Sequence, residues 1–169
     1  MTTTLLKSAT TLLTMDDAAA RYDNADLLIK GGAIAAIGTD LTAPAGSEVI
    51  NAQGCLVTPG LINTHHHLYQ TLTRAVPAGQ DALLFGWLRS LYPIWARMTP
   101  DHFHVSAQVG LAELALSGCT LSADHLYLFP NDCTLDDEIR AVQAMGLRFH
   151  ASRGSMSVGQ SQGGLPPDT

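Results

Sequence analysis

Apolar and polar residues alternate in short segments over the first sixty residues, and this pattern predicts β-structure. Gly31 and Gly32 form a two-residue connection typical of a tight hairpin. Short strands separated by turns, with no helix start signal between them, predict a small sheet or half of a sandwich. The predicted strands are Leu5–Thr14, Ala25–Lys30, Ala33–Gly38, Ser47–Asn51 and Gly54–Val57.

From Pro59 onward, compact apolar segments alternate with helical patterns. A helix start is predicted at Thr99, a capping hydroxyl followed by Pro100 at the first helical position. A second helix is predicted to begin at Thr134 and to end before Gly146. The order strand, helix, strand, helix, strand predicts parallel strands joined by helical crossovers. The three strands are predicted at Gly60–Thr64, Cys119–Ala123 and Leu147–Ala151.

Composition indicates a folded chain and narrows the classes of partner. The 169 residues are 46% hydrophobic and 14% charged, which suits a chain with a buried core. A net charge of −6 with only 9 Lys and Arg argues against a nucleic-acid partner. The three cysteines show no CxxC spacing, which favours a reduced cytoplasmic protein. No apolar run approaches the ~20 residues of a membrane helix, and no signal peptide is recognisable. We therefore expect neither a membrane nor a nucleic acid as partner.

The end of the chain, Ser155–Thr169, is rich in Ser, Gly, Gln and Pro and is predicted to be loop. Three parallel strands leave open edges, and three strand–helix units cannot close a barrel. We therefore expect the N-terminal part of a longer protein. Its domains would be a small β domain over residues 1–58 and three strand–helix units over residues 59–169.

Candidate chemistry concentrates in the stretch PGLINTHHH, residues 59–67. Side chains alternate along a strand, so His65 and His67 are expected on one side while His66 points away. Two imidazoles at the carboxyl end of a strand can share one divalent metal, and α/β barrels place their active sites at that end. A solvated histidine-rich loop without metal is the alternative. The apolar strand and the Pro-Gly pair before the histidines favour the metal site.

The longer stretch PGLINTHHHLYQTLTR resembles the first barrel strand of the amidohydrolase superfamily, whose members carry an HxH pair there. The segment NAQGCLVTPG is similar to the end of the small β domain that precedes the barrel in these enzymes. HHHLYQTLTRAVP and SRGSMSVGQSQGGLPPD resemble the aminohydrolase branch in particular. The resemblance implies an α/β fold: the N-terminal part of a (β/α)8 TIM-type barrel, preceded by a small β-sandwich domain.

By this resemblance, His65 and His67 become the first two ligands of one divalent metal, with Zn2+ expected and Fe2+ as the alternative. The family's remaining ligands, a histidine and an aspartate, have no counterpart in these residues. The glutamate and the second histidine that transfer protons in the family are missing as well. The 169-residue chain alone is therefore expected to be inactive.

The resemblance also suggests three substrate-binding residues. Gln70 matches a glutamine that contacts the purine in related deaminases, and the alternative is a surface polar residue. Trp95 stands where relatives acting on adenosine-like substrates have a glutamate, so it would offer a flat apolar face; the alternative is helix core. Arg153 follows the third strand and could hold an oxo group, and the alternative is a surface ion pair. Asp124 and His125 are interpreted as structural supports.

The implied function is metal-dependent hydrolytic deamination of a purine base, either 8-oxoguanine, to urate and ammonia, or guanine. A triazine or pterin aminohydrolase is the alternative within the same chemistry. A non-catalytic metal-binding module is the alternative from another class. The partner would be a small heterocyclic substrate, and the complete protein is expected to be a homo-oligomer.

Overall fold

The computed structural model describes residues 2–162 and separates into two compact units, Met1–Pro59 and Gly60–Thr169. The last residues of the SRGSMSVGQSQGGLPPD segment and of the predicted terminal loop lie outside the described residues. Over the described part of the chain, no helix has the length and apolar character needed to cross a membrane.

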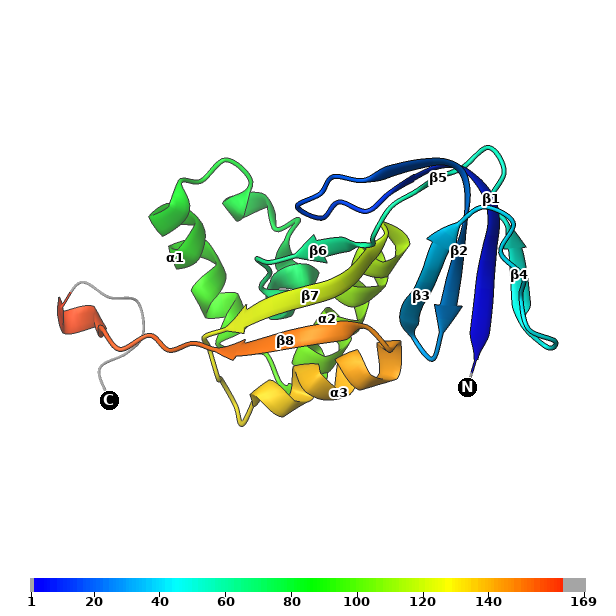
Figure 1. Ribbon diagram of the computed structural model, residues 1–169. Helices are drawn as coiled ribbons and strands as arrows, with labels where there is room; N and C mark the ends of the chain where they lie inside the picture. Colours follow the sequence, from blue (N-terminus) through cyan, green and yellow to red (C-terminus); the bar gives the residue numbers. More distant parts are fainter. Residues whose placement is uncertain (1, 163–169) are drawn as a thin grey trace. The chain divides into compact units, whose positions relative to one another are not determined.

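The first unit is built on a sheet with the strand order β3-β2-β1-β4, and β5 also pairs with β1 (Figure 1). Gly31 and Gly32 join β2 to β3 with φ values of 58° and 82°. These left-handed conformations suit glycine and confirm the predicted hairpin. The strands are β1 (Thr3–Leu13), β2 (Arg21–Lys30), β3 (Ala33–Gly38), β4 (Glu48–Asn51) and β5 (Leu56–Val57).

β3 has its predicted bounds, whereas the other four strands of this sheet differ from their predicted extents by one to four residues at an end. β2 begins at Arg21, because the polar stretch before Ala25 pairs with the long β1 strand. β4 and β5 both run parallel to β1, so the turn between them bends the chain without reversing it. The turn is closed by the Cys55 backbone N–H, which donates to the Ala52 carbonyl at 3.0 Å. β5 is therefore only Leu56–Val57.

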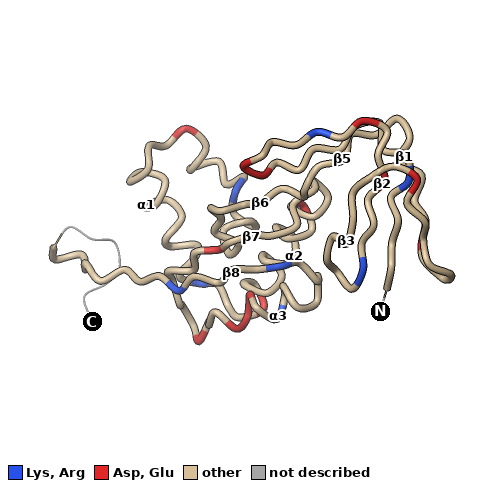
Figure 2. Tube along the Cα trace, in the orientation of Figure 1, with Lys and Arg blue, Asp and Glu red and all other residues tan. Residues whose placement is uncertain are grey.

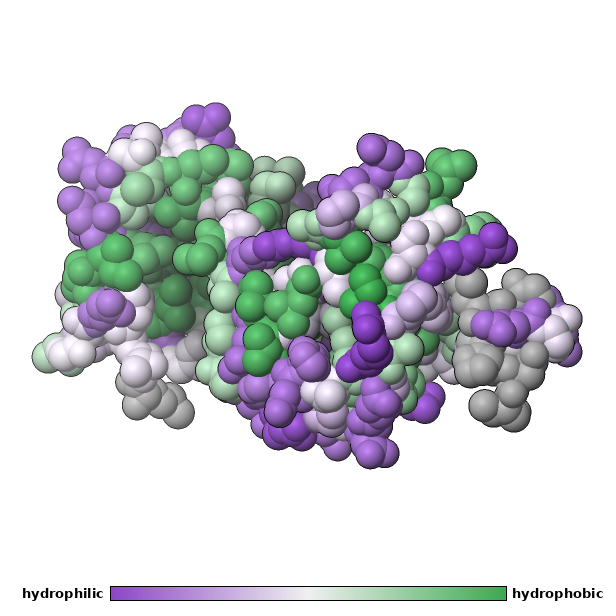
Figure 3. All heavy atoms as spheres, turned by 180° about the vertical axis from the view of Figure 1, so that it is seen from behind, coloured by the Kyte–Doolittle hydropathy of each residue, from purple (hydrophilic) through white to green (hydrophobic). Residues whose placement is uncertain are grey.

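Buried side chains of the first unit lie on both faces of its sheet, because Leu27 and Leu28 are consecutive residues of β2. Leu5, Ala9 and Leu12 of β1 are buried, together with Leu27 and Leu28 of β2. The described residues of this unit form one five-stranded sheet rather than two packed sheets. Apolar side chains also reach the surface of each unit, as Figure 3 shows on the face opposite to that of Figure 1.

The second unit contains the predicted parallel sheet, in the order β6-β7-β8 (Figure 1). β7 and β8 each run a few residues further than predicted, so that β7 ends at Leu126 and β8 at Arg153. The strands are β6 (Leu61–Asn63), β7 (Cys119–Leu126) and β8 (Arg148–Arg153). The helices are η1 (Leu68–Thr73), η2 (Pro77–Gly79), α1 (Leu84–Trp95), α2 (Pro100–Leu116), α3 (Leu135–Met145) and η3 (Gln160–Gln162).

Both predicted helix starts are confirmed as capping boxes. The Thr99 side chain and His102 close the start of α2, while Thr134 and Asp137 close the start of α3. Acidic residues are concentrated at the start of α3 (Figure 2), where the positive end of the helix dipole stabilises a negative charge. Gly146 ends α3 in the left-handed conformation, with φ 73°.

One apolar cluster joins η1, α2 and α3. Its buried members are Leu68, Ala107, Leu111, Ala141 and Val142, and side chains of β8 pack against it. The helices therefore cover one face of the sheet. The carboxyl ends of β6, β7 and β8 lie at one edge, which is where parallel sheets usually carry their binding sites.

Candidate functional site

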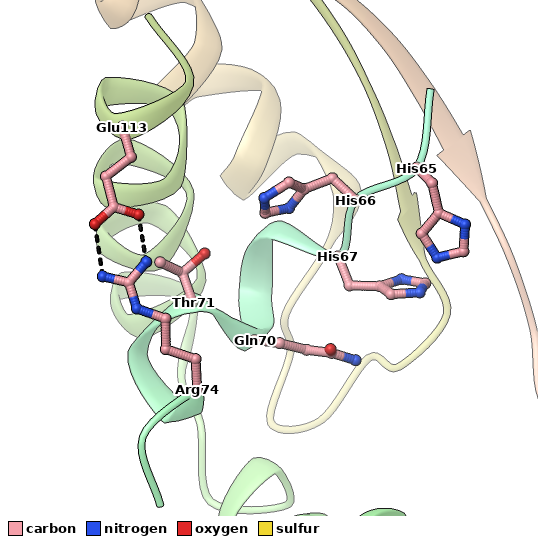
Figure 4. Close-up of a pocket in the computed structure, with 7 residues that line it drawn as sticks. All are labelled: His65, His66, His67, Gln70, Thr71, Arg74 and Glu113. Atoms are coloured by element: carbon pink, nitrogen blue, oxygen red, sulfur yellow. Dashed lines mark hydrogen bonds and ion pairs between the residues drawn. The ribbon is translucent and has the colours of Figure 1, made fainter. Parts of the chain in front are cut away.

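The carboxyl end of β6 carries the three histidines, and they divide between two sides of the chain. His65 and His67 lie on one side, with ring centroids 5.2 Å apart, whereas His66 points toward α2 (Figure 4). This geometry agrees with the predicted alternation. The carboxamide oxygen of Asn63 accepts the His65 backbone N–H at 3.1 Å and fixes the start of the turn.

The orientation of His67 is set by the neighbouring strand. Its Nδ1 lies 2.7 Å from the backbone carbonyl oxygen of His125 at the end of β7. A carbonyl only accepts, so Nδ1 carries the proton and Nε2 is left with its lone pair. Metal-binding histidines are commonly held by such a bond from their second ring nitrogen. The lone pair of His67 Nε2 is therefore available to bind a metal ion.

A hollow of about 230 Å³ lies beside these two rings. It is bounded by the ends of all three strands, and its lining residues are Thr64, His65, His66, His67, Ala123, Asp124, His125 and Ser152. Two neutral imidazoles fit a zinc or iron ion, but a catalytic zinc usually has at least three protein ligands. Within the described residues, no group of three or more His, Cys, Asp or Glu side chains could hold a metal. Two imidazoles side by side could supply two of the ligands of such a metal site.

A second hollow, of about 330 Å³, is also lined by all three histidines and extends to Gln70 and Thr71 (Figure 4). His66 lines it together with the ion pair between Arg74 of the chain after η1 and Glu113 of α2. Burial lowers the pKa of His66, although the carboxylate of Asp124 opposes that effect. His66 is therefore favoured as a neutral ring on the side away from His65 and His67.

Gln70 lies near His67 with its carboxamide already fixed. Its Nε2 donates to the hydroxyl oxygens of Tyr69, at 2.9 Å, and Tyr127, at 3.0 Å. The Tyr127 ring also meets the His67 ring edge-on, with centroids 5.2 Å apart. With both amide protons engaged, Oε1 is the atom of Gln70 left to accept a hydrogen bond. Sequence reasoning did not single out Tyr127, although it follows His125 by only two positions.

The structure does not bring Trp95 to the histidines. Its ring has no exposed surface, and its Nε1–H donates to the Thr73 hydroxyl at 2.9 Å. The ring packs against Tyr69, Trp87 and Tyr92 in the core that covers η1. Trp95 therefore belongs to the core beside Tyr69, whose hydroxyl accepts from Gln70, and presents no face to the histidines.

Arg153 lies at the carboxyl end of β8, on the same edge as the histidines. Its guanidinium stacks over the Phe129 ring, 4.6 Å from the centroid, and the side chain is exposed. Neither of the two hollows beside the histidines includes Arg153. Within the described residues it makes no ion pair, so the charge is not committed to a carboxylate.

Asp124, near the end of β7, has a clear structural contact with the histidine turn. Its Oδ1 accepts the backbone N–H of Leu68 at 2.6 Å, directly after His67. His125 contributes through its backbone, since its N–H donates to the His66 carbonyl at 2.9 Å and its carbonyl holds His67. Both residues thus tie the turn to β7.

The chain is similar in sequence to known deaminases and aminohydrolases. The chain is 46% identical to an 8-oxoguanine deaminase of Pseudomonas aeruginosa over 146 residues, which cover 83% of this chain and 32% of the relative. It is 37% identical to a hydroxydechloroatrazine ethylaminohydrolase of a Pseudomonas species, with 99% of this chain and 38% of the relative covered.

Among solved structures, an atrazine chlorohydrolase of Arthrobacter aurescens in complex with zinc superimposes with a TM-score of 0.90 at 36% identity. The match covers 98% of this chain and 38% of that protein. The chain thus spans about a third of the length of the relatives it matches. Residues 56–165, which include the histidine turn and all three strands of the parallel sheet, match the amidohydrolase family, and the chain belongs to that family.

Proposed function

We propose that this chain supplies the first metal ligands and part of the substrate pocket of a hydrolytic aminohydrolase. The observation that carries the proposal is the pair of His65 and His67 on one side of the β6 end, with the His67 Nδ1–H held by the His125 carbonyl. In this proposal the second unit is the beginning of a (β/α)8 barrel, and the first unit belongs to a small β-sandwich. A homo-oligomer in the cytoplasm is the proposed setting.

The proposed metal is Zn2+, with Fe2+ as the alternative, because neutral imidazoles serve both ions. A zinc-complexed relative of similar structure supports zinc. When bound, such an ion lowers the pKa of a coordinated water toward about 7 and so supplies the nucleophile of a hydrolysis. The chain's own contribution is to present the Nε2 atom of His67 in the correct tautomer and to hold His65 beside it.

The proposed substrate is a purine base, 8-oxoguanine or guanine, supported by the 46% identity to an 8-oxoguanine deaminase. Gln70 would accept an N–H of the heterocycle through Oε1, since Tyr69 and Tyr127 occupy its amide nitrogen. Arg153 would hold an oxo group after leaving the Phe129 ring. The contribution of Trp95 would pass through its contact with Tyr69. A hydroxylated triazine is the second candidate, supported by the ethylaminohydrolase match over nearly the whole chain.

Release of ammonia from 8-oxoguanine or guanine, and of ethylamine from hydroxyatrazine, by the natural full-length protein tests the proposal. His65→Asn and His67→Asn should each lose most of the bound metal and the activity, whereas His66→Asn should keep the metal content close to wild type. Equal metal loss in all three variants would contradict the assignment of ligands. Activity on hydroxyatrazine alone would replace the purine with the triazine.

A second test concerns Arg153. Arg153→Met should lower kcat/KM for 8-oxoguanine by more than tenfold, because a hydrogen bond from a charged group contributes about 1.5–3 kcal/mol. The bound metal should be unchanged. Arg148→Met, at the start of the same strand, is the matched control and should leave kcat/KM unaltered. Equal effects of the two substitutions would remove Arg153 from the substrate site.

A further inference from the structure

Two carboxyl groups lie buried beneath the histidine turn. Glu138 stands in the first turn of α3 and has no exposed surface, and Asp124 near the end of β7 is 1% exposed. Both are among the largest fully buried side chains of the described residues. A buried acid normally has a cation or several hydrogen-bond donors as partners, because an isolated charge in the interior is costly.

Several carboxyl oxygens of this pair lack a hydrogen-bond donor. Asp124 Oδ1 accepts the Leu68 backbone N–H at 2.6 Å, but Asp124 Oδ2 and both oxygens of Glu138 accept no hydrogen bond from the described residues. Neither acid forms an ion pair there. The nearest arginine on α3, Arg140, pairs with Asp137 instead. The three remaining carboxyl oxygens therefore face one another, and the only influence from elsewhere on Glu138 among the described donors is the Tyr69 backbone N–H, which opposes the rise of its pKa.

Adjacent carboxyl groups in a dry site satisfy one another when one of them is protonated. Burial raises the pKa of both groups. The negative charge of Asp124 raises the pKa of Glu138 further, whereas the Leu68 N–H favours the ionised form of Asp124. The proton therefore belongs on Glu138, and the O–H can reach the carboxylate that lacks a second donor.

We propose that Glu138 is a positioning residue: as a buried carboxylic acid it donates its O–H to Asp124, whose other oxygen fixes the backbone directly after His67. The chain of contacts runs from α3 through β7 to the histidine turn. Glu138 would thereby set the direction of the His67 ring, together with the bond from His67 to the His125 carbonyl. The effect on metal binding rests on the proposed function, but the shared proton does not.

Infrared spectroscopy of the natural full-length protein at neutral pH tests the shared proton. Wild type should show a carboxylic acid C=O band that disappears in Glu138→Gln, whose amide still donates to Asp124. Asp124→Asn should also lose the band, because its amide nitrogen then donates to an ionised Glu138. Asp136→Asn removes an exposed acid from the same turn of α3 and should keep the band. A band that survives in Glu138→Gln overturns the proposal.

Metal affinity tests the positioning role. Glu138→Gln should bind zinc within about twofold of wild type, while Glu138→Leu should lose roughly 10- to 100-fold, as is usual when the support of a ligand is removed. Zinc affinity of a folded Glu138→Leu equal to that of wild type would overturn the role. Should Glu138→Leu not fold, Asp124→Leu replaces it with the same expectation. If wild type binds no metal, the proposed function fails, and the infrared result still decides the carboxyl pair.

Discussion

Three donors surround the carboxylate of Asp26 in the first unit. They stabilise its ionised form, whereas Glu138 is proposed to be protonated. Lys7 Nζ lies at 2.7 Å, the Ser8 backbone N–H at 2.8 Å and the Leu41 backbone N–H at 2.9 Å. Burial alone would raise the pKa of Asp26, but these donors together hold the pKa below its usual value. Asp26 is therefore an ionised link between β1, β2 and the chain after β3.

Asp26→Asn should lower the free energy of unfolding at neutral pH by about 1–3 kcal/mol, because the amide leaves donors without an acceptor. The extra stability of wild type is present above the pKa of Asp26 in the unfolded chain, near 3.9. It is lost as the pH falls through the lower pKa of Asp26 in the folded protein. Urea unfolding at neutral pH and at about pH 3 measures both effects. Asp23→Asn, on the exposed part of β2, should change little. Equal losses in the two variants would contradict the role of Asp26.

Glu138 should make the free energy of unfolding depend on pH in the opposite direction to Asp26. Its folded pKa is raised by burial and by Asp124, with a smaller contribution from Asp137. Between the unfolded and folded pKa values, the folded protein holds a proton that the unfolded chain has lost. The free energy of unfolding should therefore fall with rising pH, by up to about 1.4 kcal/mol per pH unit for one proton. Glu138→Gln should flatten this slope between about pH 5 and pH 8. Parallel stability curves for the two proteins would exclude a retained proton.

The sequence predicts the histidine arrangement better than it predicts the buried groups. Alternation along a strand is sufficient to place His65 and His67 together. The burial of Trp95 depends on how α1 lies over η1, which no local pattern encodes. Glu138 was not singled out, because acids in the first turn of a helix ordinarily serve the helix dipole. Its burial depends on the folded structure, in which the Glu138 side chain meets Asp124 of β7.

Among the elements, α2 and η1 pack closely against each other at Gly110. A Cβ atom built on Gly110 would lie 2.8 Å from Thr71 Oγ1 and 2.9 Å from Leu68 Cδ2. These atoms belong to the short helix that follows the histidines. Any side chain on Gly110 would therefore have to displace η1 or the helix that carries it.

Gly110→Ala should lower the free energy of unfolding by about 1–3 kcal/mol, in spite of the better helix propensity of alanine. Gly86→Ala in α1 is the matched control, because its Cβ would meet only Ala82 Cβ, at an ordinary 3.6 Å. This control should gain about 0.5–1 kcal/mol. Thermal or urea unfolding of both variants provides the measurement. A stabilising Gly110→Ala would show that the two helices separate easily.

Element boundaries could be predicted where a specific residue marks them. The hydroxyls of Thr99 and Thr134 mark the two capped helix starts, and Gly146 marks the end of α3. The polar beginning of β2 carries no such mark, since its strand character comes from pairing with β1. The parallel course of β4 and β5 is likewise set by the partner strand, which is distant in sequence.

For the molecule as a whole, the decisive measurement is zinc binding by the polypeptide of residues 1–169 itself. Two imidazoles without a third ligand should bind zinc weakly, and the polypeptide should release no ammonia from 8-oxoguanine or guanine. Isothermal calorimetry measures the affinity, with His65→Asn as the control that removes one of the two ligands. Tight binding by this polypeptide would favour the alternative of a non-catalytic metal-binding module.

The pairing of β6 with β7 also bears on the order of folding. His67 and the His125 carbonyl that orients it are separated by 58 residues, whereas the β7–β8 pair closes a loop of roughly half that length. Each doubling of loop length costs about 0.6 kcal/mol in closure entropy, and contacts distant in sequence form more slowly. The β7–α3–β8 unit should therefore form first, and β6 should then pair with the edge of β7 that is still open. The histidine pair would then acquire its geometry in a late step of folding, so added metal should slow unfolding more than it speeds refolding.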